Sequence, residues 1–100
     1  MENVTRSPFV PTKRQYELLN ALYSGMVVLH KYHIPEYEKT DMRKKFAAYA
    51  KELDELEVPF AVQNSVAMAG EKSENWDRYN RTVLAEVFAK GFSPQTVYQK

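Results

Sequence analysis

The chain contains no cysteine among its 100 residues. This absence excludes a disulfide framework, a zinc ribbon and a thiolate nucleophile. Small secreted domains usually carry disulfides, so the absence also favours an intracellular, cytoplasmic protein. The chain does not open with a basic segment followed by an apolar run, and we therefore expect no secretory signal peptide.

Long apolar runs and charge of one dominant sign are missing as well. Uninterrupted apolar stretches such as residues 26–29 fall far below the roughly 20 residues that a membrane helix needs. Fourteen Lys and Arg face thirteen Asp and Glu, which gives a formal net charge of +1 at pH 7. This balance argues against strong non-specific nucleic-acid binding, because cations that neutralise phosphates supply most of that affinity. We expect no membrane partner.

A first helix is predicted by a start signal, a periodic pattern and a stop signal. Thr12 and Gln15 have the spacing of a capping box, in which each side chain bonds the other residue's backbone N–H. Apolar residues then recur at a near-helical period as far as His33, where Pro35 ends the pattern. Gly25 lies in the middle of this helix, where it either permits a close helix crossing or marks a kink.

A second helix is predicted to begin between Pro35 and Asp41 and to end at Val58 and Pro59. Its apolar residues are spaced alternately four and three apart, which is the heptad spacing of a packing seam. This seam consists of Met42, Phe46, Tyr49, Leu53 and Leu56. Such a seam fits equally inside a monomeric bundle or between two copies of the chain. We expect a homo-oligomer, with a dimer favoured.

The third helical region covers about residues 60–90 and ends at Gly91, with Pro94 shortly after it. Residues 70–75 within it carry no large apolar side chain. Either one long helix or two shorter helices with a turn near Gly70 fits this pattern. No segment shows the strict alternation of a half-buried strand.

Residues 1–11 are predicted to form an extended N-terminal arm, because Pro8 and Pro11 forbid a regular helix there. We expect Phe9 and Val10 to dock on the body of the protein or on a neighbouring subunit. The rest of the chain supports a single helical domain over residues 1–100. The predicted fold is all-α, a compact bundle of three to five helices.

Aromatic residues are abundant and suggest a surface that binds another protein. Seven Tyr, five Phe and one Trp cannot all be buried in a bundle of this size. Arginines beside aromatic residues are typical of interface hot spots, and they occur together at Trp76, Arg78, Tyr79 and Arg81. Our main hypothesis is a non-enzymatic protein-interaction module of the regulator or inhibitor type, comparable in size and class to phage or mobile-element accessory proteins.

An alternative function comes from the C-terminal residues. The stretch from Lys90 to Tyr98 resembles the turn and recognition-helix start of helix-turn-helix proteins, with Ser93 as cap and Thr96 and Tyr98 facing phosphates. The sequence departs from that family at Glu86 and Lys90, where an apolar residue is usual. The resemblance implies a small DNA-binding transcriptional regulator, whose further contacts would be Arg43, Lys44 and Lys45.

A second alternative is a small-ligand binder or enzyme that uses His30 and His33, with Tyr32 and Tyr37 lining a pocket. The two histidines share a helix face, but a metal site needs a third ligand, and the sequence supplies no clear one. Histidines at a helix C-terminus also suit its last carbonyls and the negative end of the dipole. No phosphate loop, nucleophile elbow or catalytic triad pattern is present. We therefore expect no catalytic activity, metal or cofactor.

Overall fold

The computed structural model describes residues 8–72 and 80–90, and within these ranges the regular secondary structure is all α-helix. Four helices follow one another: α1 (Lys13–Lys31), α2 (Glu36–Glu55), α3 (Phe60–Glu71) and α4 (Asn80–Lys90). The predicted all-α bundle is confirmed. The predicted stop at Gly91 and Pro94 lies outside the described residues, as do residues 1–7 of the arm.

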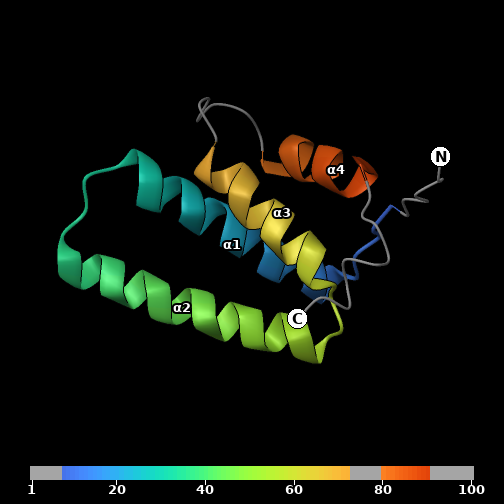
Figure 1. The fold of residues 1–100 in the computed structure, drawn as a ribbon, viewed down its shortest axis with the longest axis horizontal. Coiled ribbons are helices and arrows are strands. Elements are labelled where there is room, and N and C mark those ends of the chain that lie inside the picture. The colour runs from blue at the N-terminus through green and yellow to red at the C-terminus, as the bar shows by residue number, and fades with distance from the viewer. Residues whose placement is uncertain (1–7, 73–79, 91–100) are drawn as a thin grey trace, which may run out of the picture.

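Helix α1 is the centre of the bundle and packs against all three other helices. Figure 1 shows α2 running back along one side of α1, while α3 lies beside α1 and α4 packs on the far side from α2. Helix α3 packs mainly on α1 and touches α2 much less. The sequence periodicity agrees with this arrangement, because the apolar face of α1 is wide enough to contact several neighbouring helices.

The local signals at the start of α1 form as predicted. The Gln15 backbone N–H donates to Thr12 Oγ1 at 3.2 Å, and the Thr12 N–H donates to Gln15 Oε1 at 2.8 Å. This reciprocal pair is the expected capping box. The helix ends at Lys31, two residues before the predicted end at His33, because Tyr32 already has an extended backbone.

The heptad seam of α2 faces α1 within the same chain. Leu53 is fully buried, and Phe46, Tyr49 and Leu56 pack against the core around it. Four of the five seam residues are therefore used inside one bundle, and the fifth, Met42, is half-buried. The remaining core residues come from α1, α3, α4 and the α2–α3 loop: Leu18, Leu19, Leu22, Tyr23, Val27, Val58, Val62, Val66, Leu84 and Phe88.

Two glycines permit close helix approaches. A Cβ built on Gly25 would lie 2.4 Å from Phe46 Cε1, so this glycine makes room for an α2 ring. A Cβ on Gly70 would lie 2.7 Å from both the Tyr23 carbonyl oxygen and Met26 Cβ. Of the two alternatives for residues 60–90, the structure has the two helices: α3 ends at Glu71, and the turn that the sequence places near Gly70 follows at Lys72. Gly70 itself is helical and buried, because α3 approaches the α1 backbone there.

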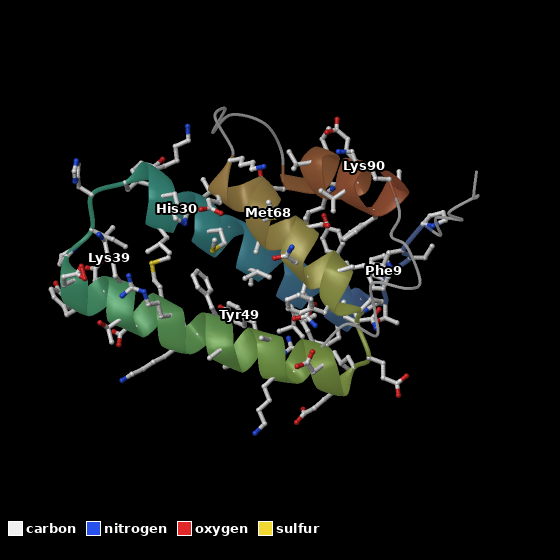
Figure 2. All side chains as sticks on the ribbon, in the orientation of Figure 1. Phe9, His30, Lys39, Tyr49, Met68 and Lys90 are labelled. Carbon is white, nitrogen blue, oxygen red and sulfur yellow. The ribbon has the colours of Figure 1, made fainter. Side chains whose placement is uncertain are left out.

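The N-terminal arm docks through one of its two apolar residues. The Phe9 N–H donates to the Phe88 carbonyl at 3.1 Å, and the ring of Phe88 packs edge-on against Phe9 and Tyr16. Figure 2 shows Phe9 where the start of α1 and the end of α4 come together. Val10 does not dock on the body of the protein, because it is 85% exposed; docking on a neighbouring subunit stays a prediction. Successive residues of an extended segment point to opposite sides, so docking Phe9 turns Val10 to solvent.

We expect Gly70→Ala to lower the free energy of unfolding by about 2 kcal/mol. Alanine gains about 1 kcal/mol in helix propensity, but its methyl group would meet a backbone oxygen that cannot move aside without shifting α1. Urea denaturation followed by circular dichroism measures the change. Ser65→Ala, at an exposed position of the same helix, is the control and should change stability by no more than about 0.5 kcal/mol.

Candidate interaction surface

The loop between α2 and α3 is a tight corner built by a helix-ending motif. The Val58 N–H donates to the Leu53 carbonyl at 2.9 Å, and the Glu57 N–H donates to the Asp54 carbonyl at 3.0 Å. This pattern is a Schellman motif, which requires a left-handed residue between the two helices. That residue is Glu57, with a φ of 62°, where glycine is usual.

Two glutamine side chains fix this corner to the rest of the bundle. Gln15 Nε2 at the start of α1 donates to the Leu56 carbonyl at 3.0 Å. Gln63 Nε2 on α3 donates to the Val58 carbonyl at 3.1 Å and to Asp54 Oδ1 at 2.9 Å. Gln63 is the one buried polar side chain among the described residues. The start of α1, the end of α2 and the start of α3 are therefore joined by polar contacts.

An ion pair joins α1 and α2 beside this corner. Arg14 Nε lies 2.7 Å from Glu52 Oε2, and Arg14 Nη2 lies 2.9 Å from Glu52 Oε1, which makes a two-pronged contact. Glu17 approaches the same guanidinium at 3.3 Å. The hydrogen bonds from Arg14 lower the pKa of the Glu52 carboxyl, and Glu52 raises the pKa of Arg14.

The side of α3 that faces away from α1 carries large apolar side chains. Phe60 is 48% exposed and Met68 is 41% exposed, and Asn64 lies between them with Nδ2 3.5 Å from Met68 Sδ. Because residues four apart lie above one another on a helix, the three form one stripe. We call Phe60, Asn64 and Met68 the α3 stripe. Figure 2 labels Met68 on this helix.

The predicted partner-binding and DNA-binding residues are only partly described. Arg81 is exposed on the first turn of α4, whereas Trp76, Arg78 and Tyr79 lie outside the described residues. Ser93, Thr96 and Tyr98 of the helix-turn-helix-like segment also lie outside them. Arg43, Lys44 and Lys45 are all exposed on α2, at consecutive positions that spread around the helix.

The residues of the predicted histidine site lie at or near the turn between α1 and α2. His30, His33, Tyr32 and Tyr37 are all exposed, so they do not enclose a pocket. Figure 2 shows His30 near the end of α1 and Lys39 across the turn on α2. Within residues 8–72 and 80–90, no group of three or more His, Cys, Asp or Glu side chains could hold a metal ion.

The sequence reasoning did not find Phe60 and Met68 as surface residues. The signal was present: both fall outside the core-facing pattern of Val62, Val66 and Ala69 and are themselves eight residues apart, with Asn64 midway. Sequence alone does not say which of two such rows faces the core. That choice follows from the contact between Gly70 and α1.

Comparisons with known proteins add no relative: no family model, no curated protein and no solved structure matches the chain. Among the described helices, none combines the length and apolar character required to span a membrane.

We expect Glu52→Gln to reduce the acid sensitivity of the fold. The pKa of Glu52 is lowered in the folded chain, so its carboxylate stabilises the fold at pH values above 4.5, the usual pKa of this group. That contribution is lost as the pH falls through the lowered folded pKa. The urea midpoint, followed from neutral pH into the acid range below 4.5, should fall more steeply for the wild type than for the variant. Parallel curves would contradict this role.

We expect Glu57→Gly to raise the free energy of unfolding by about 0.5–1 kcal/mol. The left-handed conformation costs a residue with a Cβ about 1–2 kcal/mol, and the greater unfolded-state entropy of glycine cancels part of the gain. Thermal and urea unfolding measure the difference. Glu55→Gly, two residues earlier in helical geometry, should destabilise the fold by about 1 kcal/mol.

Proposed function

We propose that this protein is a non-enzymatic protein-interaction module, of the regulator or inhibitor type, that binds a macromolecular partner through the α3 stripe. The observation that carries the proposal is the exposure of Phe60 and Met68 on a helix whose opposite side already fills the core. Large apolar residues at helical spacing on a free face are the usual anchors of helix-mediated recognition.

The energetics support such a role. Removing the exposed part of a Phe or Met side chain from water is worth about 1 kcal/mol. Phe60 and Met68 together would then contribute about 2 kcal/mol, or roughly thirtyfold in affinity. The fold gains nothing from their exposure, because Val62 and Val66 supply the buried side of α3.

A second contact region is part of the proposal. Arg81 is exposed at the start of α4, and Trp76, Arg78 and Tyr79 precede it in the sequence. Arginine and aromatic residues together are enriched in interface hot spots, and we keep this group as a candidate extension of the binding surface.

We expect Phe60→Asp and Met68→Asp each to reduce partner retention at least about tenfold without unfolding the protein. A carboxylate removes the apolar contact and must be desolvated when the partner binds, but exposed substitutions change stability little. The measurement is affinity capture from a lysate of the source cells, with and without nuclease, using equal amounts of folded bait.

Tyr37→Asp is the matched control, because Tyr37 is also exposed but lies at the far end of the bundle. Its retention of the partner should equal that of the wild type. Unchanged capture by both α3 variants would show that the α3 stripe is not the binding surface. A bound species that disappears with nuclease would instead support the helix-turn-helix alternative.

A further inference from the structure

Three acidic residues lie just before the α3 stripe in the chain. Asp54 and Glu55 end α2, and Glu57 follows in the loop immediately before Phe60. The contact between Asp54 Oδ1 and Gln63 Nε2 places this carboxylate beside α3. All three residues are exposed, and the last turn of α2 contains no basic residue. We call Asp54, Glu55 and Glu57 the acidic corner.

Two features of the acidic corner lower the local stability of the fold. The C-terminus of a helix carries partial negative charge, so acidic residues there are unfavourable and basic residues are usual. Glu57 also occupies a left-handed position at which glycine would be less strained. Positions that break local rules without a gain for the fold are expected at functional surfaces. Asp54 has a role in the fold as the acceptor for Gln63, but the charges of Glu55 and Glu57 are better explained by a charged partner.

We infer that the α3 stripe receives a cationic amphipathic helix of a partner protein; this inference rests on the proposed function. The row of Phe60, Asn64 and Met68 is a ridge of residues four apart, the kind that fits the groove of a second helix. It spans nine residues, about 12 Å along the axis from Phe60 to Met68, which matches two to three turns of a bound helix. Apolar side chains of the partner cover Phe60 and Met68, and its Lys or Arg side chains face the acidic corner.

Charge also argues against the two other candidate occupants. In an antiparallel pair of α3 helices centred on Asn64, Phe60 meets Met68 of the other copy, but Glu57 then lies near the other Glu71. In a parallel pair, Glu57 faces its own equivalent. Either arrangement sets like charges against each other. A nucleic-acid backbone is likewise repelled by the acidic corner.

The test uses two labelled synthetic peptides with the same leucine face, one with lysine and one with glutamate on its polar face. Fluorescence anisotropy measures their binding to the intact protein, and amide chemical shifts map the site. We expect the lysine peptide to bind at least about tenfold more tightly than the glutamate peptide, and less tightly as salt is raised. The changes in amide chemical shift on binding should concentrate on Phe60, Asn64 and Met68. In Phe60→Asp, these changes should disappear.

A double variant isolates the charge contribution. Glu55→Gln with Glu57→Gln should weaken the lysine peptide about threefold to tenfold and flatten its salt dependence. Glu36→Gln with Glu38→Gln makes the same change in net charge at the opposite end of α2 and should leave binding unchanged.

Several outcomes would overturn the inference. Equal or tighter binding of the glutamate peptide, or shifts that map away from the α3 stripe, would reject a cationic helix as the occupant. Concentration-dependent dimerisation lost in Met68→Asp would identify a second copy instead, and contacts between Phe60 and residues 91–100 of the same chain would identify the chain's own end. If neither peptide binds but Phe60→Asp still loses the captured partner, the proposed function stands and the partner class is wrong.

Discussion

The close approach of α3 to α1 at Gly70 is the constraint on which the rest of the structure depends. The Tyr23 carbonyl and Met26 Cβ leave no space for a side chain at this position, so the two backbones lie in direct contact. That contact fixes the rotation of α3 about its own axis. Val62 and Val66 must then point into the core, and Phe60 and Met68 must point away from it. The apolar surface of α3 is thus a consequence of the same packing that closes the core.

The polar contacts at the α2–α3 corner make this orientation rigid at the other end of α3. Gln15 and Gln63 satisfy the last carbonyls around the end of α2, which would otherwise be costly to bury near the core. Since Gln63 bonds the loop and Asp54 together, the acidic groups keep a fixed position relative to α3. The candidate surface is built on helices held at both ends, which favours a preorganised binding site.

The sequence predicted those features that depend on neighbouring residues and missed those set by distant contacts. The capping box at Thr12 and the heptad seam from Met42 to Leu56 are local patterns, and the structure contains both. The role of Gly70 was missed, because a helical glycine and a turn glycine differ only in what packs against them. Phe60 and Met68 were missed for the same reason, since their exposure follows from the rotation of α3. The aromatic excess did indicate exposed aromatic residues, and Tyr32, Tyr37 and Phe60 are among them.

The corner shows how stability and recognition can be separated within one short segment. The backbone of the Schellman motif does not require a glutamate side chain at position 57 and would form best with glycine. Only the side chain distinguishes glutamate there, and Glu57 is exposed, whereas Val58 and Leu53 of the same motif are buried. Glu57 weakens the motif it belongs to and precedes an apolar stripe that the core does not use, and this combination is the reason for proposing a partner at this surface. The stability of the bundle rests on α1 and its glycine contacts, and the outer side of α3 can therefore change in sequence at little cost to the core.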